Sequence, residues 1–301
     1  MMNIWGSEFI LIPKAKILLA KALYFWFWLL ILLPAGLWAQ ESRLLFLPAE
    51  PNFEHLIGDP REAQSYLSAQ LDKAQFDGSI AAIIEFLQWK PGDNTRWGWG
   101  LETDSFIQLE SPGYGPYSLE TLDYFLIFPE RVSDLYLGTY LSESSGDLSN
   151  RLEFLHDSSQ LGDGFFGKEQ GIIYTRSSLR FTSSFQPSDR FRLYAGTGYY
   201  IQNLYGQPSF FFHLGTELYT ASFGAPFGTM GRGYFTYDLQ ANQDVIGVLN
   251  QNFELGFQWK WKKDTHQAIR FALVYYNGNS PYGQFYFQKD DHWAFSLYFD
   301  P

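Results

Sequence analysis

Apolar and polar side chains alternate with a period of two along most of this chain, and this alternation restricts the possible folds more than any other feature. Successive side chains of a β-strand point to opposite faces of the sheet. Residues 253–261 place Phe253, Leu255, Phe257, Trp259 and Trp261 on one face and Glu254, Gly256, Gln258 and Lys260 on the other. Residues 190–200 and 292–299 alternate in the same way. After the first 40 residues no segment has helical periodicity, so the sequence predicts an all-β protein.

The length of the alternating segments favours a membrane barrel over a soluble sandwich. Strands of a sandwich run about 5–6 residues, whereas a membrane-spanning strand needs about 9–11 residues and one purely apolar face. Several segments reach the longer length, and Phe, Trp and Tyr make up 20% of the chain, a content typical of barrels with aromatic girdles. An open edge in lipid would leave backbone groups unpaired, so such a barrel must close. We expect an antiparallel transmembrane β-barrel; a periplasmic β-sandwich is the alternative fold.

About twelve strands fit the pattern, and ten to fourteen are possible. The expected strands are 79–89, 95–109, 120–128, 134–143, 149–157, 171–185, 190–201, 209–219, 232–239, 250–262, 267–276 and 292–299. Short periplasmic turns should alternate with long extracellular loops. Residues 186–189 and 262–265 fit as short turns, and 240–249, 277–290 and the stretch after His156 fit as long loops. Residues 110–119 and 220–231 do not fit this alternation.

The first 39 residues predict a cleaved signal peptide. Lys14, Lys16 and Lys21 precede the apolar run 23–33, which is too short for a spanning helix of about 20 residues. Pro34 follows, and we expect cleavage after Ala39; an N-terminal anchor is the alternative. Export and a barrel together predict the outer membrane of a Gram-negative cell.

Residues 40–65 form a segment of different character before the barrel domain, 66–301. Three prolines and the lack of any period indicate a non-strand arm, which we place on the periplasmic side. Its apolar residues suit a plug or a docked segment, and a simple tether is the alternative. At the other terminus, we expect the last strand to end at Phe299, with Asp300 and Pro301 beyond it.

Charge and cysteine content narrow the possible functions. The chain has no cysteine, so it has no disulfide, thiolate nucleophile or zinc–thiolate site. Removal of residues 1–39 takes away three Lys and one Glu and lowers the formal charge from −11 to −13. An acidic chain argues against nucleic-acid binding.

No histidine pair has metal-ligand spacing, and we expect no metal or cofactor. The expected partners are outer-membrane lipids, lipopolysaccharide and the barrel-assembly machinery; the oligomeric state is open.

Three blocks of sequence carry a family resemblance. Residues 46–62 (FLPAEPNFEHLIGDPRE), 151–165 (RLEFLHDSSQLGDGF) and 275–286 (YYNGNSPYGQFY) resemble, in the same order, the signatures of an uncharacterised bacterial family, domain of unknown function 1207. The resemblance implies an outer-membrane barrel and implies no activity. Gln160 stands where the family's H-x-S-S-H block has a second histidine, so chemistry that needs two histidines there is in doubt.

The second block contains the chain's most specific candidate for chemistry. His156 and Ser158 are two residues apart and share one face of a strand near the expected extracellular rim. This spacing is similar to that of outer-membrane lipid A deacylases, in which histidine activates serine and an acid orients the imidazole. Asp163 or Glu153 could be the acid. The simpler interpretation is structural, because residues 157–159 and 162–164 also suit turns.

Two functions of different class therefore remain. The first is a non-enzymatic barrel that serves as a pore, a structural component or a binding component of the outer membrane. The second is a lipid A deacylase-like hydrolase that uses His156, Ser158 and Asp163. A pore needs a lumen free of bulky plugs, whereas a hydrolase needs a sealed barrel and an outward-facing pair that is open to lipid.

Overall fold

A computed structural model describes residues 43–73, 75–92, 94–110, 130–161, 172, 174–202, 209–224, 229–243, 248–261 and 267–300. The predicted signal peptide, 1–39, lies outside these residues and stays a prediction. Leu44–Pro301 forms one compact unit, in which the arm and the barrel are a single body. No helix of the described residues is long and apolar enough to cross a membrane.

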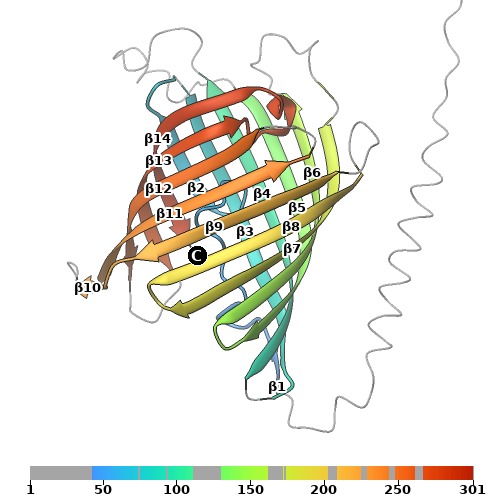
Figure 1. The fold of residues 1–301 in the computed structure, drawn as a ribbon, viewed down its shortest axis with the longest axis vertical. Coiled ribbons are helices and arrows are strands. Elements are labelled where there is room, and N and C mark those ends of the chain that lie inside the picture. The colour runs from blue at the N-terminus through green and yellow to red at the C-terminus, as the bar shows by residue number, and fades with distance from the viewer. Residues whose placement is uncertain are drawn as a thin grey trace, which may run out of the picture. The chain divides into compact units, whose positions relative to one another are not determined.

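Twelve strands of the described chain form a closed antiparallel ring (Figure 1). They are β2 (Ser65–Gln70), β3 (Gln75–Lys90), β4 (Thr95–Glu110), β5 (Glu130–Ser145), β6 (Leu148–Leu161), β7 (Tyr174–Ser188), β8 (Phe191–Gln202), β9 (Phe210–Tyr219), β11 (Met230–Asn242), β12 (Leu249–Lys260), β13 (Ala268–Asn279) and β14 (Lys289–Asp300). Each pairs with the next along the chain, and β14 pairs with β2 to close the ring. The predicted barrel is confirmed.

The predicted number of strands is right, but one member of the ring differs. The strand expected at 120–128 lies outside the described residues, and β4 pairs directly with β5. The ring's additional strand is β2, which begins where we placed the end of the arm. Two short strands, β1 (Arg43–Phe46) and β10 (Phe223–Gly224), pair with β3 and β11 without joining the ring.

The two faces of the wall differ in the way that the alternation predicts. On β12, Leu255 is 64% exposed on the outer face, whereas Glu254 is 2% exposed on the lumen face. Leu179 and Phe181 of β7 are exposed, and Arg180 between them is buried. An apolar outer face with every ladder closed is the arrangement that hydrocarbon requires.

The two ends of the barrel differ in the length of their connections. At one end, here called the turn end, the strands are joined by residues 91–94, 146–147, 189–190, 220–229 and 261–267. Gly146 has a φ of 59°, which a tight turn of this kind favours and which glycine adopts without strain. At the other end, here called the loop end, the connections are 71–74, 111–129, 162–173, 203–209, 243–248 and 280–288. Because β4 pairs with β5, residues 111–129 are a long connection at the loop end, in agreement with the alternation. Two connections depart from it: 220–229 is long at the turn end, and 71–74 is short at the loop end.

The expectation for the C-terminus is wrong at Asp300. This residue belongs to β14 and is 7% exposed, and its carboxylate accepts a hydrogen bond of 2.9 Å from Nε of Arg270. The Nε2 atom of His55 lies 3.6 Å from the same carboxylate. Asp300 therefore faces the lumen as part of the wall, and the alternation from Trp293 to Phe299 continues one residue further than we expected.

Candidate functional site

Residues 52–64 of the arm lie in the lumen of the barrel (Figure 1). Most of their side chains are buried or half-buried although the segment has no strand or helix, with Leu56 at 0% and Asp59 and Glu62 at 1% exposure. Their partners are inward-facing residues of strands all round the ring. Of the two interpretations of the arm, plug and tether, the geometry agrees with the plug.

Four inward-facing arginines of the wall hold the arm. Arg151 of β6 donates two hydrogen bonds of 2.7 Å to the carboxylate of Glu62. Arg180 of β7 lies 3.2 Å from Asp59 and 3.4 Å from Glu62. Arg192 donates to the backbone carbonyls of Glu54 and His55 at 2.7 and 2.8 Å, and Arg270 donates to the side chain of Gln64. These charge-assisted bonds fix the arm at four places along its length.

Buried ion pairs also set the charge state of the arm. Burial alone raises the pKa of Glu62, but Arg151 and Arg180 outweigh it and lower this pKa to about 2. A second ion pair has the positive charge on the arm and the negative charge on the wall: Arg61 of the arm donates a 2.8 Å hydrogen bond to Asp134 of β5. The Arg61 guanidinium also lies 4.0 Å from the ring centre of Phe106, a cation–π distance. The arm therefore both accepts and supplies ion pairs.

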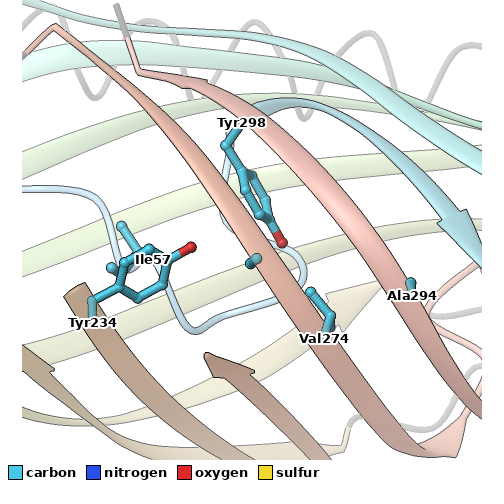
Figure 2. Close-up of a cluster of buried hydrophobic side chains, with 6 residues drawn as sticks. Ile57, Tyr234, Val274, Ala294 and Tyr298 are labelled. Carbon is cyan, nitrogen blue, oxygen red and sulfur yellow. The ribbon is translucent and has the colours of Figure 1, made fainter. Parts of the chain in front are cut away.

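Apolar contacts complete the fit of the arm. Ile57 packs in a buried cluster with Tyr234 of β11, Val274 of β13 and Ala294 and Tyr298 of β14 (Figure 2). Phe53 and Leu56 form a second cluster with Tyr194 of β8. An ideal Cβ at Gly58 would lie 3.1 Å from Cβ of Thr236, so the arm backbone approaches β11 closely there. The packing shows that the arm fills this part of the lumen.

A cavity of about 150 Å³ remains at the loop end of the lumen. Asp59, Pro60 and Arg61 of the arm line one side of it. The wall contributes charged and amide groups and several aromatic rings, including Tyr136, Asp157, Tyr174, Arg176, Arg180, Tyr200, His213, Asn250, Tyr276 and Tyr286. A second cavity of about 70 Å³ also borders Asp59 and Pro60 and is lined by Asp77, Glu254 and Tyr282, among others.

The three sequence blocks that carry the family resemblance meet inside the barrel. The Arg151–Glu62 pair joins the second block to the first. Gln284 of the third block donates its backbone N–H to Oγ of Ser159, at 3.1 Å, and its side-chain amide to the Ser159 carbonyl, at 2.8 Å. All three blocks contribute residues to the loop-end cavity. This convergence makes the plugged lumen the candidate functional site.

His156 and Ser158 lie elsewhere, on the outer face of β6 near the loop end. The alternation of β6 places Asp157 and Ser159 inward and His156 and Ser158 outward. Nδ1 of His156 lies 3.0 Å from Oγ of Ser177, and Nε2 lies 3.4 Å from Oγ1 of Thr175, both on β7. The structure thus brings the two residues to one face, but the described hydrogen bonds of His156 go to β7.

The acid proposed for this pair is not supplied by Glu153. That residue is fully buried in the lumen, where Nε of Arg151 lies 3.0 Å from its carboxylate, so it faces away from His156. Asp163, the other candidate, lies outside the described residues. The catalytic role of His156, Ser158 and Asp163 stays a prediction.

Sequence reasoning missed the arginines that hold the arm. Their signal is the presence of arginine at lumen-facing positions of several strands together with the acidic residues Asp59 and Glu62 in the arm. Within the described ranges, no three His, Asp or Glu side chains are arranged to hold a metal ion.

Comparisons with known proteins identify the family to which the chain belongs. No curated protein matches this sequence. Among solved structures, the β domain of the Bordetella autotransporter BrkA is similar with a TM-score of 0.44 and 12% sequence identity, over 79% of this chain and 99% of that one. The model of the protein family of unknown function DUF1207 matches residues 45–300, and the chain therefore belongs to that family.

Proposed function

We propose that this protein is an outer-membrane barrel that its own arm keeps closed, and that it serves as a binding component of the envelope and not as an open pore. One observation carries this proposal: residues 52–64 lie in the lumen and are held there by Arg151, Arg180, Arg192 and Arg270. The cavity that the arm leaves open at the loop end is the proposed binding site.

The proposed location follows from the chemistry of the wall. Its outer face carries exposed Leu, Ile, Phe and Trp side chains, which suit lipid and not water. With the predicted signal peptide, this favours the outer membrane, with its lipids and lipopolysaccharide as surroundings and the assembly machinery as a transient partner. We expect the protein to fractionate with outer membranes and to migrate faster on gels when unheated. Recovery as a soluble periplasmic species would contradict this location.

Single-channel recording tests the closed state. The purified full-length protein, reconstituted in planar bilayers, should insert without giving a steady conductance, because the arm and its ion pairs occupy the lumen. Insertion is checked separately by flotation of the same protein with liposomes. A steady, reproducible open-channel current from the intact protein would show that the arm does not close the barrel.

A hydrolase at the outer face is the second candidate. It is favoured by the position of His156 and Ser158 on the lipid-facing side near the loop end, where an acyl chain of the outer leaflet could reach them. Ionisable residues on a membrane face are rare and are functional candidates by default. The hydroxyl of Ser177, 3.0 Å from Nδ1 of His156, could orient the ring.

Lipid analysis decides between the two candidates. Cells that produce the wild-type protein, the Ser158→Ala variant or the Ser133→Ala variant, a serine nearby on β5, are compared for lipid A and phospholipid acylation. The hydrolase requires a change in acylation with wild type and Ser133→Ala that disappears with Ser158→Ala. Identical lipids in all three strains would exclude this candidate.

A further inference from the structure

We propose that the loop-end cavity binds a small, neutral, hydroxyl-rich molecule, either a polyol or the edge of a single sugar residue, and that Asp157 and Arg176 recognise its hydroxyl groups. This inference rests on the proposed binding function and specifies the ligand. Four features of the cavity carry it: an unmatched acceptor, a fixed guanidinium, charges of both signs and the available volume.

The unmatched acceptor is the carboxylate of Asp157. This side chain lines the cavity from β6 and is only 8% exposed, and its Oδ1 atom has no hydrogen-bond partner among the described residues. A buried acceptor left without a donor costs about 1–3 kcal/mol, so such atoms usually have a partner. A hydroxyl group of a bound molecule would supply the missing donor.

The fixed guanidinium belongs to Arg176, which lies directly opposite Asp157 in the pairing of β6 with β7. Its Cζ atom is 4.8, 4.7 and 4.8 Å from the ring centres of Tyr174, Tyr200 and Tyr286. Three rings around one guanidinium hold it in place against the cavity. A guanidinium donates N–H groups and a carboxylate accepts, and a hydroxyl group can satisfy either.

The charged side chains that line the cavity are of both signs, which argues against an ionic ligand. Arg61 pairs with Asp134 at 2.8 Å, and Arg180 pairs with Glu153 and Asp59. Asp157 and Arg176 add one negative and one positive group on adjacent strands. Neither an anion nor a cation meets a lining of uniformly opposite charge, whereas a neutral hydroxyl group can accept from the guanidinium and donate to the carboxylate.

Volume and lining agree with a polyol. A cavity of about 150 Å³ is the size that accommodates benzene in an engineered protein core, so it suits a molecule of about six heavy atoms such as glycerol. Tyr136, Tyr276 and Phe211 add aromatic rings to the lining, against which the C–H faces of a polyol or sugar can pack.

Saturation-transfer NMR on the full-length protein in a zwitterionic detergent without sugar headgroups tests the inference. The probes are glycerol and D-glucose as neutral molecules, inorganic phosphate as an anion and methylammonium as a cation. Glycerol or glucose should give a saturable signal, and Asp157→Asn and Arg176→Lys should each weaken apparent affinity at least fivefold. Asp77→Asn, a buried carboxylate that lines only the second cavity, is the matched control and should leave affinity unchanged. Heat-modifiable migration confirms that each variant is folded.

The outcomes separate this inference from the proposed function. Saturable binding of phosphate or methylammonium that depends on Asp157 or Arg176, with no binding of glycerol or glucose, would overturn the ligand class and leave the binding function standing. Equal loss in Asp77→Asn and Asp157→Asn would overturn the assignment to this cavity. If none of the four probes binds saturably, both the inference and the proposed binding function fail. If Asp157→Asn does not fold, the Arg176→Lys variant carries the same decision.

Discussion

The turn end and the loop end of the lumen are built from the same strands but are filled differently. Towards the turn end, Arg192 and Arg270 reach the arm directly, and Ile57 is packed against the wall. Towards the loop end the arm does not fill the lumen, and a cavity remains between Pro60 and Arg61 of the arm and Asp157 of the wall. The difference indicates that the arm closes the barrel from the turn end and leaves a recognition surface open at the other.

Removal of the arm should have the largest effect on this arrangement. Deletion of residues 43–64 takes away the carboxylates and carbonyls that bind the four arginines and leaves a lumen lined by charged side chains. We expect steady single-channel currents where the intact protein gives none. Heat-modifiable migration serves as the folding control, and an Arg151→Gln/Arg180→Gln variant, which weakens the arm without shortening the chain, should give intermittent openings. A folded deletion variant without conductance would show that the arm is not the barrier.

Loss of one carboxylate should loosen the arm by a smaller amount. Glu62→Gln leaves Arg151 and Arg180 paired with Glu153 of the wall but without their shared partner on the arm, and breaking a buried pair costs about 3–5 kcal/mol. The arm should then become sensitive to protease in the folded protein. Asp291→Asn is the control, because the Lys289–Asp291 pair is exposed and such pairs contribute about 0–1 kcal/mol. Equal protease resistance in both variants would contradict the role of Glu62.

A substitution on each face of β12 tests whether the two faces have been assigned correctly. Leu255→Arg places a charge on the lipid face, where it costs about 2–4 kcal/mol near the midplane, and should lower the folded, heat-modifiable fraction. Gln258→Arg faces the lumen within reach of Asp300 and should be tolerated better. If the two variants assemble equally well, the register of β12 is wrong.

Moderate acid should change the closed state least. The pKa of Glu62 is lowered by its arginines from its ordinary value near 4.3 to about 2 in the folded protein. A lowered pKa contributes stability that is fully present above about pH 4.3 and is lost as the pH falls through about 2. Protease resistance of the arm should therefore be the same at pH 7 and pH 5. If the arm becomes sensitive to protease between pH 7 and pH 5, ionised Glu62 is not the group that holds it.

The sequence predicted the barrel and its faces because both depend on local alternation. The six residues of β2 are too few to show that alternation clearly, so β2 was not predicted as a strand. The predicted total of twelve instead included a strand at 120–128. Local patterns also placed His156 and Ser158 on one face, as observed.

The plug could not be predicted in the same way. Arg151 and Glu62 are 89 residues apart, and Arg180 and Asp59 are 121 apart, so nothing in the local sequence joins them. Closure of the ring brings these positions together, and only then do charged residues on separate strands become one site. The same holds for Asp300, which has no visible role until Arg270 and His55 are placed beside it.

The most direct test of the account is a covalent link between the arm and the wall. The chain has no cysteine, so Gly58→Cys and Thr236→Cys introduce a single pair, at positions where an ideal Cβ on residue 58 would lie 3.1 Å from Cβ of Thr236. Mild oxidation of the folded protein, followed by digestion and mass spectrometry, should show one disulfide between the arm and β11. The control pair, Gly58→Cys with Phe235→Cys, has its second cysteine on the outer face and should not form a disulfide. Absence of the link in the first pair, or equal linking in both, would contradict an arm held inside the lumen.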